Sequence, residues 1–279
     1  MKFVFRLAIF LLLMLNGLII PAQSELNIVS YNIRYDNPDD PFSWSDRKNL
    51  IASRILTAHA DVVGFQEALN HQAIMLKELL PGYKWTGVGR DNGMEEGEFC
   101  AIFYNAKRLK LIESSTFWLS GQPELIGSKG WDAACIRICT WAQFTSRNEK
   151  DTFYFFNVHL DHIGQESRVE STKLILQRIN ELCEGKKILL AGDFNCTPDQ
   201  EPVRLIGQSG LINIVAQHEK EIPSSCTYNN FKYVRKGRQI DYIFTSPEYK
   251  TVSISIPQPV ENQIIPSDHN PIVARIILE

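Results

Sequence analysis

The sequence lacks features that would indicate several domains, a cysteine-based metal or redox site, or a strongly basic binding surface. It has no internal repeat, no low-complexity block and no linker rich in proline, glycine and serine, so we expect a single domain. Its 6 cysteines include no CxxC pair, which leaves little support for a zinc or dithiol redox site, and buried thiols are expected instead. The formal net charge is only -3. That value argues against a broad nucleic-acid-binding surface, although one local basic groove would suffice.

The one long apolar run has the layout of a secretory signal peptide. Lys2 and Arg6 precede an apolar segment from Leu7 to Ile20, and small residues follow it. The run is short for a membrane anchor, which is the alternative. We expect a signal peptide over residues 1–23, a mature domain over residues 24–279, and a secreted or periplasmic protein. Cleavage removes two cations and no acidic residue, so the mature chain would carry a net charge of -5.

Hydrophobic patterning predicts many strands and few helices. Strands are expected over residues 26–33, 61–67, 83–88, 99–104, 109–119, 134–144, 152–160, 188–191, 238–244, 251–256 and 271–278. Helices are expected over residues 46–59, 68–80, 165–183 and 200–206. Strands interspersed with a few helices indicate two packed sheets with helices outside them, an α/β or α+β sandwich.

The segment Lys187–Pro198 combines an apolar strand with polar residues at its end. Its apolar run predicts a strand buried on both faces, and a glycine and a proline end it. Asp193 and Asn195 stand two residues apart at the strand end and therefore point the same way. Taken alone, the segment is equally well explained as a strand followed by an ordinary turn.

Other strands end in the same kind of residue. Polar side chains lie at or next to the ends of apolar strands at Asn32, Glu67, His159, Asp193, Asn195, Asp241, Asp268 and His269. Their oxygen donors suit Mg²⁺, Mn²⁺ or Ca²⁺ better than zinc. Histidines with nearby aspartates suit acid–base catalysis or phosphate binding.

Each of these residues also has a purely structural explanation. Asn32 can cap a loop, and Glu67 can cap the helix that follows it. His159 can be a core histidine whose hydrogen bonds are satisfied. Asp241, predicted to lie inside a strand, can pair with Arg238. So many coincidences in one chain favour a shared site.

Six segments, in this order, resemble the endonuclease/exonuclease/phosphatase superfamily, which includes deoxyribonuclease I. They are Tyr31-Asn32-Ile33, Gln66-Glu67, Asn157-Val158-His159-Leu160, Gly192-Asp193-Phe194-Asn195, Ile240-Asp241-Tyr242 and Ser267-Asp268-His269-Asn270-Pro271. The resemblance implies a deoxyribonuclease-I-like, four-layer α/β/β/α sandwich in which helices flank two packed mixed β-sheets. It also implies that Glu67 is the main ligand of Mg²⁺ (or Mn²⁺), with Asn32 and Asp268 close by.

The resemblance implies a catalytic role for five further residues. Asp193 would orient or deprotonate the attacking water, and Asn195 would hold a phosphate oxygen. His269 would contact the scissile phosphate with Asp241 as its carboxylate partner, and His159 would lie against the phosphate or the leaving group. The physical logic agrees, because phosphoester hydrolysis needs charge neutralised on the phosphoryl oxygens and an activated water.

Residues in the loops are candidates for substrate binding. Beside Asn32, they are His162, Arg168, Tyr233 and Arg238. The loop containing Tyr233 and Arg238 mixes aromatic and basic residues, which suits nucleotides or phosphorylated head groups, but a solvated β-hairpin explains it equally well. The acidic loop 90–98 can hold a second cation, although a solvated loop is favoured.

The substrate is therefore expected to be a phosphoester, either a nucleic acid, a nucleotide or a phosphorylated head group. The sequence leaves three functions open. The first is a secreted metal-dependent nuclease or nucleotide phosphodiesterase. The second is an inositol-phosphate phosphatase or a sphingomyelinase-like phospholipase C, and the third is a non-catalytic binding module. No stable protein partner is implied, and a monomer is expected.

Overall fold

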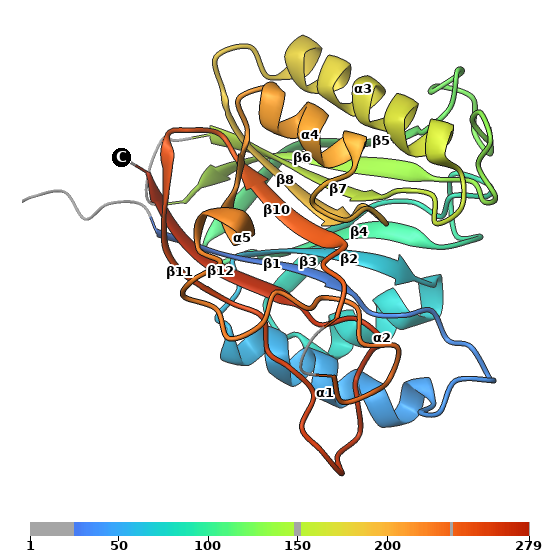
Figure 1. Ribbon diagram of the computed structural model, residues 1–279, viewed down its shortest axis with the longest axis vertical. Coiled ribbons are helices and arrows are strands. Elements are labelled where there is room, and N and C mark those ends of the chain that lie inside the picture. Colours follow the sequence, from blue (N-terminus) through green and yellow to red (C-terminus); the bar gives the residue numbers. More distant parts are fainter. Residues whose placement is uncertain (1–24, 148–151, 235–236, 279) are drawn as a thin grey trace, which may run out of the picture.

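Two β-sheets stacked face to face form the centre of the molecule (Figure 1). A computed structural model describes residues 25–147, 152–234 and 237–278. The expected signal peptide and the turn of the expected hairpin, Lys236-Gly237, fall wholly or partly outside these described residues. None of the helices in the described segments has the length and apolar character needed to cross a bilayer.

Each sheet contains six strands. The first has the order β11 (Tyr249–Ser255), β12 (Ile272–Leu278), β1 (Glu25–Asn32), β2 (Val62–Ala68), β4 (Phe99–Asn105), β3 (Tyr83–Thr86). The second has the order β5 (Leu109–Trp118), β6 (Ile138–Ser146), β7 (Thr152–His159), β8 (Lys187–Asp193), β10 (Asp241–Thr245), β9 (Ile212–Asn213). Both sheets mix parallel and antiparallel pairs, as expected.

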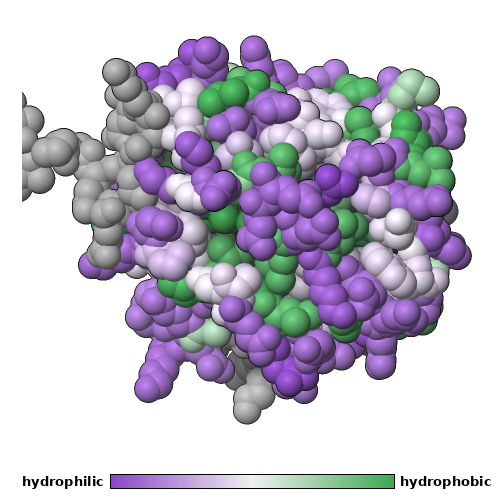
Figure 2. Space-filling model, turned by 90° about the horizontal axis from the view of Figure 1, so that it is seen from above, coloured by the Kyte–Doolittle hydropathy of each residue, from purple (hydrophilic) through white to green (hydrophobic). Residues whose placement is uncertain are grey.

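The helices cover the outer face of each sheet. In Figure 1, α1 (Trp44–Thr57) and α2 (Asn70–Leu79) lie beneath the first sheet, and α3 (Gln165–Leu182) and α4 (Glu201–Gln208) lie above the second. The short α5 (Ile214–Gln217) packs near β10. The result is the four-layer α/β/β/α sandwich that the resemblance implied. Hydrophilic residues cover most of the outer side of α3 and α4, with apolar residues in small groups between them (Figure 2).

The strands are buried on both faces because each has a sheet on one side and helices on the other. In β1, Ile28 packs into the core between the sheets, whereas Val29 and Tyr31 pack into the core against α1 and α2. In β8, Leu189 faces the core between the sheets and Leu190 faces the core against α3 and α4. This is why the strands read as continuous apolar runs in the sequence.

One buried amide joins the two sheets. Asn157 of β7 donates hydrogen bonds from its Nδ2 to the carbonyl oxygens of Phe65 (2.9 Å) and Ala101 (2.9 Å) of the other sheet. Its Oδ1 accepts a hydrogen bond from Gln66 Nε2 (2.6 Å). A Cβ added to Gly64 would lie 2.8 Å from that Oδ1, so only glycine fits the close approach of β2 to Asn157.

Most differences from the expected elements lie at their ends. Helix α1 begins at Trp44 because Ser43 and Asp46 form a capping box there. Strand β6 begins at Ile138, four residues later than expected. Strand β10 begins at Asp241, so this aspartate starts a strand instead of lying inside one. All six cysteines are free and five are buried, while Cys135 is half-buried.

Candidate active site

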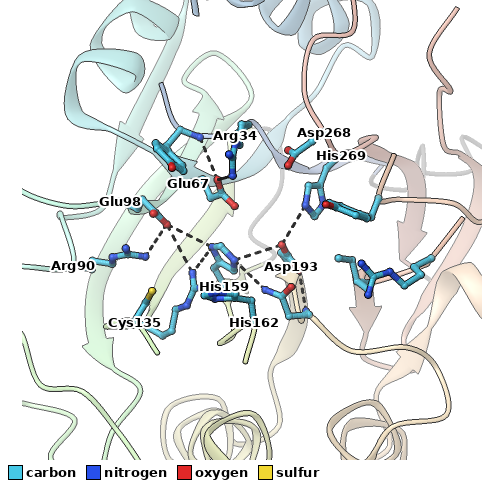
Figure 3. Close-up of a pocket in the computed structure, with 16 residues that line it drawn as sticks. Arg34, Glu67, Arg90, Glu98, Cys135, His159, His162, Asp193, Asp268 and His269 are labelled. Carbon is cyan, nitrogen blue, oxygen red and sulfur yellow. Dashed lines mark hydrogen bonds and ion pairs between the residues drawn. The ribbon is translucent and has the colours of Figure 1, made fainter. Parts of the chain in front are cut away.

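The strand ends of the two sheets meet at one edge of the molecule. β1 runs parallel to β2, and β7 runs parallel to β8. The antiparallel strands β10 and β12 begin where these four end. A cavity of about 690 Å³ lies there (Figure 3). It is lined by Arg34, Tyr35, Glu67, Arg90, Glu98, Cys135, Arg137, His159, His162, Asp193, Asn195, Tyr228, Arg238, Ile240, Asp268 and His269.

Asn32 lies beneath the cavity and connects its two halves. Its Nδ2 donates hydrogen bonds to Glu67 Oε1 (2.9 Å) and to Asp193 Oδ2 (2.9 Å). Glu67 has a φ of 62°, a strained conformation that aims its carboxylate at the site. The backbone N–H of Tyr35 donates to its Oε2 (3.2 Å). Glu67 does not cap α2, because the Gln72 side chain accepts the backbone N–H at the start of that helix. The helix-cap explanation is therefore wrong.

The segment that carries Asp268 is held to the end of β1. Arg47 is fully buried, and its Nη1 donates to the carbonyl oxygens of Ile33 (2.6 Å) and Pro266 (3.0 Å). Ser267 Oγ donates to the carbonyl oxygen of Asn32 (2.7 Å). These bonds hold the segment before β12 against the end of β1. They keep Asp268 close to Asn32, although the two residues are far apart in the sequence.

Asp241 pairs with His269 and not with Arg238. His269 Nδ1 lies 2.9 Å from Asp241 Oδ2, and both side chains are buried. Arg238 instead stacks over the ring of Tyr228 at 5.1 Å, and Tyr228 meets the His269 ring edge-on at 5.1 Å. Burial alone would lower the pKa of His269, but the charges of Asp241 and Asp193 raise it well above its ordinary value. The two carboxylates therefore favour the imidazolium form of His269, whose side chain lines the cavity.

Asp193 lies at the centre of the polar cluster. Its Oδ1 accepts the backbone N–H of Asn195 (2.9 Å), while its Oδ2 lies 3.5 Å from His159 Nε2 and 3.7 Å from His269 Nε2. Burial and the nearby charge of Asp241 raise the pKa of Asp193 to about 7. A carboxylate with this pKa is a stronger base than an exposed one, as a general base working near neutral pH requires.

His159 is buried but is not a residue of the apolar core. Arg137 Nη1 lies 2.9 Å from its Nδ1. A guanidinium only donates, so Nδ1 accepts and the ring proton is on Nε2. Burial and the positive charge of Arg137 lower the pKa of His159 well below its ordinary value. Its neutral Nε2 edge lies beside Asp193 and Asn195, whose Nδ2 is 3.2 Å away.

The four loop candidates for substrate binding divide into two pairs. His162 and Arg238 line the cavity, and His162 Nδ1 lies 3.1 Å from Arg137 Nη2. Arg168 does not line the cavity, because its Nη1 is buried and donates to the carbonyl oxygen of Asp161 (3.0 Å). Tyr233 is 44% exposed and also lies outside the lining.

Sequence reasoning missed the wall of the cavity made by Arg90, Glu98 and Arg137. The loop 90–98, interpreted as a solvated loop, folds inward at its end. Glu98 Oε2 lies 2.7 Å from Arg90 Nη1 and 3.8 Å from Arg137 Nη1. One signal was available: Glu98 directly precedes the buried strand β4, as Asp268 and His269 precede β12. Arg34, which follows β1 and lies 3.9 Å from Glu67, was also missed.

Glu67 and Asp268 are suited to hold a divalent cation. Both carboxylates line the cavity. Burial raises the pKa of Asp268, and the charge of Glu67 raises it further against the opposing effect of His269. Ligand atoms of Glu67, His159 and Asp193 all lie within 4.8 Å of one another. Carboxylate oxygens crowded into one cavity fit a hard cation such as Mg²⁺ or Mn²⁺.

The model of the Endonuclease/Exonuclease/phosphatase family matches residues 29–269. The chain belongs to this family. Members of the Endonuclease/Exonuclease/phosphatase family are phosphoester hydrolases that depend on a divalent metal, so the chain is a phosphoric ester hydrolase. The match includes the ends of β1, β2, β7 and β8, the start of β10, and the residues Asp268 and His269 that precede β12.

Solved structures agree over almost the whole length. An endonuclease/exonuclease/phosphatase from Bacteroides vulgatus is 34% identical with a TM-score of 0.87, over 92% of this chain and 100% of that chain. A mannosyl-6-phosphatase from Bacteroides thetaiotaomicron VPI-5482 is 34% identical with a TM-score of 0.84, over 91% of this chain and 100% of that chain. Nocturnin of Rattus norvegicus is 26% identical over 263 residues, 84% of this chain and 58% of nocturnin.

Proposed function

We propose that this chain is an exported phosphatase that uses Mg²⁺ or Mn²⁺ to hydrolyse the phosphomonoester of a small phosphorylated molecule, a sugar phosphate being the leading candidate. The observation that carries this proposal is the charge of the cavity. Its lining holds four arginines and the protonated His269 against four carboxylates. With a divalent cation, the lining has an excess of positive charge that matches a terminal phosphate dianion better than a singly charged diester.

Two further observations support this substrate class. The mannosyl-6-phosphatase that resembles this chain is matched over its entire length. The mature chain would carry a net charge of -5, which opposes long contacts with a polyanion. Export is proposed from the signal-peptide pattern that begins with Lys2 and Arg6.

In the proposed reaction, the chain's own residues bind the phosphoryl group and move one proton. His269, Asn195 and the Nε2–H of His159 donate hydrogen bonds to the phosphoryl oxygens. Asp193 accepts a proton from the attacking water, whose oxygen forms the new bond to phosphorus. The ester P–O bond breaks, and the departing alkoxide takes a proton from solvent. Asp241 keeps His269 protonated and correctly oriented.

Glu67, with Asp268 and Asn32 nearby, would hold the cation. The bound cation would neutralise charge on the phosphoryl oxygens as it increases during the reaction. Arg34 and Arg238 line the same cavity and would neutralise the charge further.

A nucleotide phosphodiesterase is the second candidate. Tyr228 lines the cavity with Arg238 stacked on its ring, an arrangement on which a base can also stack. The exposed Tyr233 lies further along the same segment.

A substrate panel at fixed salt tests the proposal. The purified protein with Mg²⁺ is assayed against hexose 6-phosphates, inositol phosphates, a single-stranded oligonucleotide, sphingomyelin and bis-p-nitrophenyl phosphate. We expect the highest kcat/KM on a small phosphomonoester. The variant Asp193→Asn, with its fold checked by circular dichroism, is the inactive control. A preference for the oligonucleotide or another diester would overturn the phosphatase assignment.

A further inference from the structure

The loop from Gly89 to Glu98 is folded tightly enough to hold its ends in a fixed position. The N–H of Gly89 donates to the carbonyl oxygen of Met94 (2.9 Å), and that of Arg90 donates to the carbonyl oxygen of Glu98 (3.2 Å). A Cβ on Gly89 would lie 2.2 Å from the carbonyl oxygen of Glu96. The two ends of this loop therefore bring Arg90 and Glu98 side by side on the wall of the cavity (Figure 3).

The two side chains form a largely buried ion pair. Arg90 Nη1 donates to Glu98 Oε2 at 2.7 Å, with side-chain exposures of 16% and 17%. The carbonyl oxygen of Arg90 accepts a hydrogen bond from Trp118 Nε1 (2.7 Å), which anchors the loop to β5. Glu98 Oε2 also lies 3.8 Å from Arg137 and 3.9 Å from His159 Nδ1. The pair is thus next to the proposed phosphate-binding residues, one side chain away from the reacting centre.

Glu98 keeps one oxygen for a ligand. Its one hydrogen bond from a described side chain goes to Oε2, and none of the residues 25–147, 152–234 and 237–278 donates a hydrogen bond to Oε1. Burial raises the pKa of Glu98, which marks it as a carboxylate that gains from a hydrogen-bond donor. An ionised phosphate oxygen cannot be that donor, because it carries no proton and the carboxylate repels its negative charge.

A carboxylate and a guanidinium side by side recognise hydroxyl groups. The carboxylate accepts from a hydroxyl, and the guanidinium donates to the same or the adjacent hydroxyl oxygen. We propose that Glu98 and Arg90 form a subsite for adjacent hydroxyl groups of the substrate, which selects phosphorylated sugars and polyols over other phosphoesters. This inference rests on the proposed phosphatase function and assigns its specificity.

The variant Glu98→Gln tests the subsite, with Glu95→Gln as the matched control. Glu95 is an exposed carboxylate of the same loop. For each protein, kcat/KM is measured on mannose 6-phosphate and on p-nitrophenyl phosphate, which lacks hydroxyl groups. Their ratio does not depend on how much of a preparation is folded. We expect Glu98→Gln to lower the ratio roughly 10- to 100-fold, the cost of leaving a substrate hydroxyl without its charged partner. Glu95→Gln should leave the ratio unchanged.

Three results would overturn the subsite. A Glu98→Gln variant that loses activity equally on both substrates would place Glu98 in support of His159. Recovery of that variant by excess Mg²⁺ would make Glu98 a metal ligand. An unchanged ratio of the two kcat/KM values would show that other residues bind the hydroxyl groups of the substrate.

Failure of the proposed function gives a different result. If the wild type hydrolyses neither compound, binding of mannose 6-phosphate is followed by saturation-transfer NMR. Binding that weakens in Glu98→Gln supports the subsite without phosphatase activity. Absence of binding to the wild type overturns both proposals.

Discussion

The carboxylate of Asp161 accepts four backbone hydrogen bonds, and we expect its replacement by asparagine to loosen one rim of the active site. Oδ2 accepts from Ala134 (3.1 Å) and Cys135 (3.0 Å). Oδ1 accepts from Ile163 (2.9 Å) and Gly164 (2.7 Å). The residue is only 1% exposed, so water cannot replace the lost acceptor. These contacts join the segment before β6 to the loop between β7 and α3.

The magnitude follows from the pKa of Asp161. Burial alone would raise this pKa, but the four N–H groups lower it from 3.8 to about 2. At 1.36 kcal/mol per pKa unit, the preference for the ionised form contributes about 2.5 kcal/mol to the free energy of unfolding. Because the folded-state pKa is depressed, the contribution is complete above pH 5 and is lost as the pH falls through 4 toward 2. At pH 3 it would be smaller by about 1 kcal/mol.

Urea unfolding of the wild type and Asp161→Asn at pH 7 and at pH 3 measures this. An amide turns an N–H₂ group toward two of the N–H donors, so the variant should be less stable by about 2–4 kcal/mol at pH 7. The difference should shrink by about 1 kcal/mol at pH 3. Glu219→Gln, which removes one exposed carboxylate, is the control. A loss below about 1 kcal/mol at pH 7, or one that is the same at both pH values, would refute the reasoning.

Three other outcomes are expected. The variant Asp241→Asn removes the negative partner of His269 at 2.9 Å, and kcat/KM should fall roughly 100- to 1,000-fold with circular dichroism unchanged; a loss below tenfold would contradict the role of this pair. Chelation with EDTA should abolish turnover, and added Mg²⁺ should restore it; full activity in EDTA would rule out the cation. The variant Gly64→Ala places a Cβ 2.8 Å from Asn157 Oδ1. Three hydrogen bonds hold the Asn157 amide group in place, so the variant should lower the free energy of unfolding by about 1–3 kcal/mol. An unchanged urea midpoint would show that the sheets can separate there without cost.

Much of the site could be predicted because strand ends are visible in a sequence. An apolar run that stops at a polar residue identifies both the strand and the side chain at its end, and local periodicity fixes which neighbours share a face. Asn32, Glu67, His159, Asp193 and His269 were found in this way, and the structure brings them together. Element boundaries were less accurate because capping decides them, as the Ser43 capping box does for α1.

Partners that depend on the distance between elements could not be predicted. The strand pattern alone left Asp241 free to pair with the nearby Arg238. Only the family resemblance implied His269 as its partner, and the packing of β10 beside the segment before β12 brings the two side chains together. Arg168 has the charge expected of an anion clamp, but the turn of the chain before α3 directs it to Asp161.

The sequence by itself determined the two-sheet sandwich and the strand-end residues, because these depend on local periodicity and on residue types. The class of reaction followed from the resemblance of its six segments to a known family. The tertiary structure alone decided that Arg90 and Glu98 line the cavity and that Tyr233 does not. Which loop residues reach a cavity depends on how the closed loops fold over the sheet edge, and that folding is set by hydrogen bonds between segments far apart in the chain.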